Sequence, residues 1–264
     1  MNHLADSGAT SGRTQFDVVG DVHGCRIELE ALLGRLGYVI KHDSQGRAVG
    51  ARHSDRRCAV FVGDLVDRGP DTPGVLRLVM GMYADGDALC VLGNHEDKLL
   101  RALRGGNVQV THGLAESLSQ LLEERAEFRN KVDTFIDGLA PHLILDYGRL
   151  VVAHAGLPER FHGLESNTAR RFCLYGETTG ETDEFGLPVR KAWAEEYRGT
   201  ATVLYGHTPV ATTEWVNNTL CLDTGCVFGG QLSALRYPER DLLVVSAGRT
   251  YYEPTGPFPP GPTL

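Results

Sequence analysis

The chain has 264 residues, of which 42% are hydrophobic and 23% charged, as is typical of a soluble globular enzyme. Its formal net charge of −8 argues against long-range attraction to a nucleic-acid backbone. No apolar run approaches the roughly 20 residues that a membrane span needs, and residues 1–15 lack the basic and apolar segments of a signal peptide. We therefore expect a cytoplasmic protein with one large domain.

Both ends of the chain are expected to lie outside this domain, which would span residues 15–252. Residues 1–14 are rich in Ser, Gly, Thr and Asp and are typical of a disordered tail. Residues 253–264 are rich in proline and are expected to form a disordered end or a linker. The six cysteines are scattered without a CxxC pair, which indicates small buried thiols in a reduced protein rather than a zinc knuckle.

The first half of the chain alternates short apolar strands with helices. Strands are expected in FDVV, CAVFV and ALCVL, each followed by a glycine and then by a helical pattern. The three helices are expected over residues 25–36, through residues 75–83 and over residues 96–105. Residues 38–55 are typical of a hairpin on the surface.

The second half is predicted to contain mostly strands. Residues 113–137 should form a helical cap, and residues 142–156 a pair of strands. An acidic loop follows at residues 174–190, then a short helix in KAWAEEY, a strand in TVLYGHTP and three more strands in TEWV, TLCLD and LLVVSA. This order predicts an α/β (α+β) fold in which two mixed β-sheets pack face to face and are flanked by helices.

Five strand-end loops carry Asp, His or Asn beside glycine: GDVHG at 20–24, GDLVDRG at 63–69, GNHED at 93–97, VAHAG at 152–156 and YGHTP at 205–209. The carboxyl ends of neighbouring strands meet at one edge of an α/β sheet, where ligands usually bind. The first three loops would bring Asp21, His23, Asp64 and Asn94 toward one point. This mixture of nitrogen and hard oxygen ligands suits divalent transition metals, so a dinuclear metal site is expected.

In this order the five motifs resemble the phosphoprotein-phosphatase branch of the calcineurin-like metallophosphoesterases, over roughly residues 16–250. Residues 174–190 and 222–239 narrow the resemblance to bacterial dinucleoside-tetraphosphatase-like phosphatases and to the phosphatase domain of bacterial polynucleotide kinase–phosphatases. The resemblance implies an αββα sandwich. It also implies that a hydroxide bridging two metal ions attacks phosphorus, while the ions clamp the phosphoryl oxygens.

The resemblance further implies which residues hold the two divalent ions. They are Asp21 and His23 for the first ion, Asp64 as a bridge, and Asn94, His154 and His207 for the second. Mixed Asp, Asn and His ligands suit manganese best, with nickel, cobalt, iron or zinc as alternatives, whereas the three histidines disfavour magnesium alone.

Four further residues are implied as catalytic. Arg68 would grip the phosphate, helped by Asn94 and His95, because a guanidinium matches the spread negative charge of the transition state. His95 would protonate the leaving oxygen, and Asp67 would orient its ring. Asp223, in LDTGC, matches an acidic position of these relatives.

Three arginines bracket the acidic loop at residues 174–190, namely Arg170, Arg171 and Arg190. Pairing with the carboxylates of that loop is favoured over contact with a nucleotide phosphate. These carboxylates are Glu177, Glu181, Asp183 and Glu184.

The substrate is expected to be a phosphorylated nucleotide or an RNA end. Hydrolysis of dinucleoside tetraphosphates is favoured, because the chain carries no P-loop kinase motif or ligase domain. Removal of 2′- or 3′-phosphates from RNA is the alternative, in which residues 253–264 would lead to kinase or ligase domains of a larger protein. Protein Ser/Thr phosphatase activity and a non-catalytic metal-binding regulatory module are further alternatives. Neither a membrane nor sequence-specific nucleic-acid binding is expected.

Overall fold

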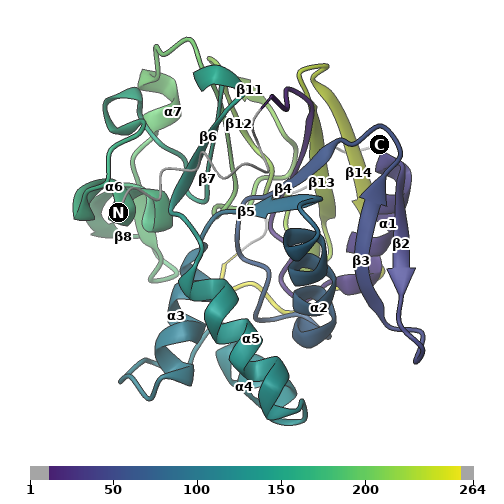
Figure 1. The fold of residues 1–264 in the computed structure, drawn as a ribbon. Coiled ribbons are helices and arrows are strands. Elements are labelled where there is room, and N and C mark those ends of the chain that lie inside the picture. Colours follow the sequence, from purple (N-terminus) through teal and green to yellow (C-terminus); the bar gives the residue numbers. More distant parts are fainter. Residues whose placement is uncertain (1–11, 257–264) are drawn as a thin grey trace.

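The computed structural model describes residues 12–256, which form two five-stranded sheets packed face to face between helices (Figure 1). The first sheet contains β1 (Phe16–Val19), β4 (Cys58–Phe61), β5 (Ala88–Cys90), β13 (Gln231–Tyr237) and β14 (Asp241–Ser246). The second contains β6 (His142–Leu145), β7 (Leu150–Ala153), β10 (Thr202–Tyr205), β11 (Trp215–Val216) and β12 (Thr219–Cys221). Their orders are β14-β13-β1-β4-β5 and β11-β12-β10-β7-β6.

Helices and two small hairpins surround the sheets. The helices are α1 (Arg26–Leu36), α2 (Thr72–Ala84), α3 (Asn94–Leu103), α4 (Leu114–Leu122), α5 (Ala126–Asp137), α6 (Asn167–Tyr175) and α7 (Trp193–Glu196). The hairpins are β2 (Tyr38–His42) with β3 (Ala48–His53), and β8 (Thr178–Thr182) with β9 (Pro188–Arg190). In Figure 1, α1 and the first hairpin lie beside β14, whereas α6, α7 and β8 lie beside the second sheet. The expected αββα arrangement of two packed mixed sheets is confirmed.

The strands β1, β4 and β5 of the first sheet are buried on both faces, because each face packs against a different layer. In β1, Phe16 and Val18 belong to the apolar cluster between the sheets, together with Leu150 of β7. Val19 points to the other face and packs in the cluster that includes Leu29 of α1. Because β1, β4 and β5 run parallel, the loops that follow them lie at the same edge of the sheet.

The structure agrees with one expectation about individual elements and corrects two others. Residues 113–137 are helical, as expected, and form two helices, α4 and α5, which both pack against α2 and α3. Residues 174–190 form the end of α6 and the β8–β9 hairpin, whose first strand is exposed throughout and so has no apolar pattern. The strand β13 was not expected, because it lies between β1 and β14 and buries even Ser233.

The expectation of small buried thiols agrees with the structure. All six cysteines are buried and unpaired. The helices that the structure describes include none long and apolar enough to cross a membrane. The predicted tails, residues 1–14 and 253–264, lie mainly outside residues 12–256, so they stay predictions.

Candidate metal centre

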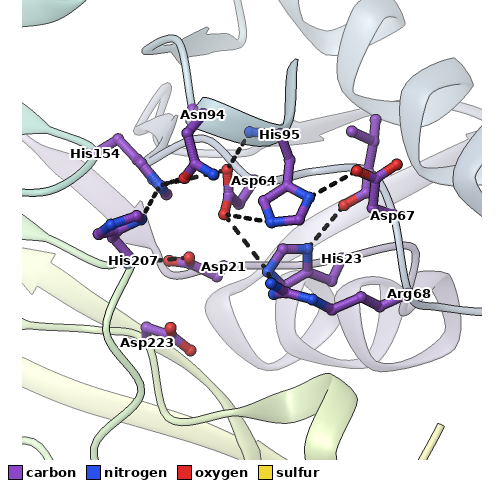
Figure 2. Close-up of polar contacts among 12 residues, drawn as sticks. Asp21, His23, Asp64, Asp67, Arg68, Asn94, His95, His154, His207 and Asp223 are labelled. Atoms are coloured by element: carbon purple, nitrogen blue, oxygen red, sulfur yellow. Dashed lines mark hydrogen bonds and ion pairs between the residues drawn. The ribbon is translucent and has the colours of Figure 1, made fainter. Parts of the chain in front are cut away.

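The six expected metal ligands meet at the edge where strands of both sheets end (Figure 2). They are Asp21 and His23 after β1, Asp64 after β4, Asn94 after β5, His154 after β7 and His207 after β10. Residues that are far apart in the sequence thus converge because neighbouring strands deliver them to one place.

Asp64 lies at the centre of this group, with its two carboxylate oxygens turned to different neighbours. Its Oδ1 is 3.3 Å from Nε2 of His154, and its Oδ2 is 3.5 Å from Nε2 of His23. The same His154 nitrogen is 2.8 Å from Oδ1 of Asn94 and 3.0 Å from Nδ1 of His207. One carboxylate therefore reaches both halves of the group, as a ligand shared by two metal ions must.

Backbone carbonyls orient two of the histidines. Nδ1 of His23 lies 2.7 Å from the oxygen of Val66, and Nδ1 of His154 lies 3.0 Å from the oxygen of Val62. A carbonyl oxygen only accepts hydrogen bonds, so each Nδ1 carries the proton and each Nε2 presents a lone pair to the site. Metal-binding histidines almost always donate their second ring nitrogen in this way.

The buried polar atoms of the group fit a divalent cation. Burial raises the pKa of Asp21 well above its ordinary value, and the charges of Asp223 and Asp64 act in the same direction. Burial also acts to raise the pKa of Asp64, but the neighbouring histidines, His154 first, hold it well below its ordinary value. Within residues 12–256, neither Oδ1 of Asp21 nor Nε2 of His207 has a hydrogen-bond partner, although both atoms are buried. A bound cation would satisfy such atoms.

The backbone of the site adopts an uncommon conformation. Of the eleven described non-glycine residues with positive φ, five are expected site residues: His23 (43°), Asp64 (50°), Asp67 (72°), Arg68 (69°) and His207 (74°). This conformation costs an L-residue about 1 kcal/mol or more. Its concentration here is typical of a functional site, where the surrounding structure holds residues against their local preference.

Glu96 supports the centre, although no role was expected for it. Its buried carboxylate accepts the backbone N–H groups of Asp64 at 2.7 Å, Leu65 at 2.7 Å, Val66 at 3.2 Å and Gly93 at 3.1 Å. Burial raises the pKa of Glu96 to about 8, and the charge of Asp64 acts in the same direction. The carboxylate therefore ties the start of α3 to the loop that presents Asp64.

Replacing Glu96 with alanine should lower the free energy of unfolding by about 3 kcal/mol or more, because each buried donor left without a partner costs about 1–3 kcal/mol. Urea denaturation of the purified variant would measure the loss. Glu123→Ala, at an exposed position after α4, is the matched control and should change stability little. A Glu96→Ala protein as stable as this control would show that the four hydrogen bonds contribute little.

His95 and Asp67 form a close pair beside the ligands. Nδ1 of His95 is 2.7 Å from Oδ2 of Asp67, whose side chain is fully buried. Nε2 of His95 points the other way and lies 3.9 Å from Oδ2 of Asp64. A carboxylate behind an imidazole fixes its tautomer and raises its basicity, so this geometry suits the expected general acid.

Arg68 and Asp223 lie on two sides of the ligand group. Nη1 of Arg68 donates to Nε2 of His23 at 2.7 Å, and the guanidinium packs over the ring of Phe228 at 5.3 Å. Asp223 lies next to Asp21 (Figure 2) and accepts the backbone N–H of Gly225 at 3.0 Å. Burial raises the pKa of Asp223 to about 6.

Two of the three arginines near residues 174–190, Arg170 and Arg190, do not pair as expected. Arg170 forms an ion pair with Asp97 at 2.9 Å, outside that acidic segment. Arg190 has no carboxylate partner among the described residues; its Nη1 donates to the oxygen of Tyr175, and burial lowers its pKa. Burial also lowers the pKa of His207, and the charge of Arg190 acts in the same direction. An unpaired guanidinium therefore lies near the second half of the metal centre.

This fold and site match those of a known family. The family model for calcineurin-like phosphoesterases matches residues 14–245, and the chain belongs to that family. It is therefore a metallophosphoesterase, an enzyme that hydrolyses phosphate esters or anhydrides with divalent metal ions.

Among its relatives, the chain is 43% identical to bis(5′-nucleosyl)-tetraphosphatase PrpE [asymmetrical] of Anoxybacillus flavithermus, over 89% of this chain and 96% of that protein. It is also 43% identical to the protein of the same name from Bacillus subtilis, over 90% of this chain and 97% of that protein. A crystal structure of a putative diadenosine tetraphosphatase is similar with a TM-score of 0.63 and 25% identity, covering 90% of this chain and 96% of that one. A protein serine/threonine phosphatase from Saccharomyces cerevisiae, with a TM-score of 0.58, 14% identity and coverage of 89% and 79%, shares the fold.

Proposed function

We propose that the chain hydrolyses dinucleoside tetraphosphates asymmetrically, adding water across one phosphoanhydride bond to release a nucleoside monophosphate and a nucleoside triphosphate. The observation that carries this proposal is the 43% identity, over about nine-tenths of the chain, to relatives named for that activity. Manganese is the favoured metal, because the ligands mix carboxylate, amide and imidazole groups. The six unpaired cysteines support a reducing compartment such as the cytoplasm.

Each site residue has a defined task in this reaction. Bound divalent ions supply Lewis-acid polarisation of the phosphoryl oxygens and lower the pKa of water. Asp64 holds the two halves of the centre at a fixed spacing. His95 donates a proton from Nε2 to the leaving oxygen, because Asp67 holds its Nδ1 at 2.7 Å. Arg68 faces the site and neutralises charge that develops on the phosphoryl group.

The positions of two arginine side chains favour a substrate with several linked phosphates over one with a single phosphate. Arg68 contacts His23 in one half of the ligand group, and Arg190 lines a cavity together with His207 of the other half. The phosphates that flank the reacting one carry charge that needs neutralisation in the partly buried site. Two guanidinium groups, one beside each half of the ligand group, would meet that need.

A comparison of substrates in the presence of manganese tests the proposal. We expect kcat/KM for diadenosine tetraphosphate to exceed that for a short RNA with a 2′-phosphate, a phosphoserine peptide and p-nitrophenyl phosphate by about 100-fold, since specific contacts discriminate by about 1–3 kcal/mol each. A preference for the RNA would overturn the proposal in favour of an RNA-end phosphatase associated with kinase or ligase domains. A preference for the peptide would indicate a protein phosphatase, and a metal-loaded protein inert toward all four would indicate a binding module.

A further inference from the structure

A cavity of about 220 Å³ adjoins the metal centre. We call it the Trp193 cavity; its lining includes Arg190, Ala192, Trp193, Tyr205, His207 and Val210. His207 belongs both to this lining and to the expected metal ligands, so the cavity borders the metal centre. Neither the motifs nor the roles assigned above account for it.

The walls of the Trp193 cavity are largely apolar and aromatic. The rings of Trp193 and Tyr205 have centroids 5.1 Å apart, and Ala192 and Val210 add small apolar side chains. The indole lies directly over Gly156, because a Cβ at that position would be 2.0 Å from Cζ2 of Trp193. Gly156 ends the VAHAG motif, so the loop that presents a metal ligand also holds the indole in place.

The two cationic side chains that line the cavity differ in whether a carboxylate pairs with them. Lys191 lies 2.6 Å from Oε1 of Glu177 and is paired. Arg190 has no ion pair among residues 12–256, and it lines the cavity together with His207. The cavity therefore joins an unpaired guanidinium near the metals to an apolar surface with aromatic rings.

We propose that the Trp193 cavity binds a nucleoside of the substrate, with the base against Trp193 and the 5′-phosphate directed to Arg190 and the metal centre. The inference rests on the proposed function and deepens it by assigning the residues that recognise the nucleoside. A flat aromatic group joined to an anion matches these walls, because bases of any sequence stack on aromatic side chains. Inorganic polyphosphate and phosphoserine peptides lack such a group.

Tryptophan fluorescence tests the contact directly, because the chain has two tryptophans, Trp193 and Trp215. Trp215 lies on the edge strand β11, under Arg240. In a Trp215→Phe protein, adenosine 5′-monophosphate should change the remaining fluorescence in a saturable manner, whereas inorganic phosphate should not. A Trp193→Phe protein is the matched control and should show no change with either ligand. A Trp215→Phe protein whose fluorescence stays constant at nucleotide concentrations that inhibit hydrolysis would overturn the proposal.

Filling the cavity provides the kinetic test. Ala192 is exposed and lines the cavity, so Ala192→Trp should obstruct the cavity without disturbing the packing of the hydrophobic core. We expect the ratio of kcat/KM for diadenosine tetraphosphate to that for p-nitrophenyl phosphate to fall about tenfold, in line with the loss of one base-stacking contact. Ala126→Trp, at an exposed position on α5, should leave the ratio unchanged.

The outcomes separate this inference from the proposed function. A wild-type protein without preference for the tetraphosphate would overturn the proposed function. A wild-type preference that persists undiminished in Ala192→Trp would overturn the role of the Trp193 cavity alone. If Ala192→Trp hydrolyses neither substrate, the fluorescence comparison tests the role of the Trp193 cavity, because it measures binding and does not depend on turnover.

Discussion

An Asp64→Asn variant should lose both divalent ions and nearly all hydrolytic activity. The wild-type carboxylate turns one oxygen toward His154 and the other toward His23, so one side chain serves both halves of the centre. An amide has one oxygen in place of two and no charge, and it cannot bridge two cations. We expect kcat to fall by about 10³-fold or more, since the metal ions contribute several kcal/mol of transition-state stabilisation.

Metal content of the purified protein, measured by elemental analysis, is the deciding observation. Asparagine is preferred to alanine at this position because Asp64 has a φ of 50°, which Asn tolerates well. Asp64→Ala should give the same metal loss with an added cost in stability. Asp55→Asn, at an exposed position after β3, is the matched control. An Asp64→Asn protein that retains its full metal content would exclude a bridging role.

A His95→Ala variant should lose turnover while keeping its metal ions. His95 is held by Asp67 at 2.7 Å and turns its second nitrogen toward the centre. Loss of a general acid reduces rates by about 10²–10⁴-fold. His95 also offers a ring nitrogen within 4.8 Å of ligand atoms of His23 and Asp64, so a role as a metal ligand is the structural alternative.

Two measurements separate these roles of His95. Retained metal with reduced kcat supports the general acid, whereas lost metal contradicts it. The loss of activity should also be larger for an RNA 2′-phosphate, whose leaving alkoxide is a strong base, than for a tetraphosphate, whose leaving phosphate needs a proton less. His42→Ala, at an exposed position of the β2–β3 hairpin, is the control and should retain both metal and activity.

The strand-end motifs were readable from the sequence because they depend on short-range pattern. Each apolar run forms a strand, and the residues after it lie at the strand's carboxyl end, so the convergence of Asp21, Asp64 and Asn94 could be expected. The face-to-face packing of the sheets was also predictable, because short apolar strands alternating with helices leave few other layer arrangements. Their assigned roles remain proposals that the variants above test.

The sequence by itself determined the family, the layered fold and the side chains that meet at the centre, because local patterns encode strand ends and motif order. Only the tertiary structure decided the position of β13, the four hydrogen bonds of Glu96 and the lack of an ion pair at Arg190 among residues 12–256. Each of these depends on which distant segments come into contact. The burial of a side chain and its hydrogen-bond or ion-pair partners depend on these long-range contacts, so a local sequence pattern does not predict them.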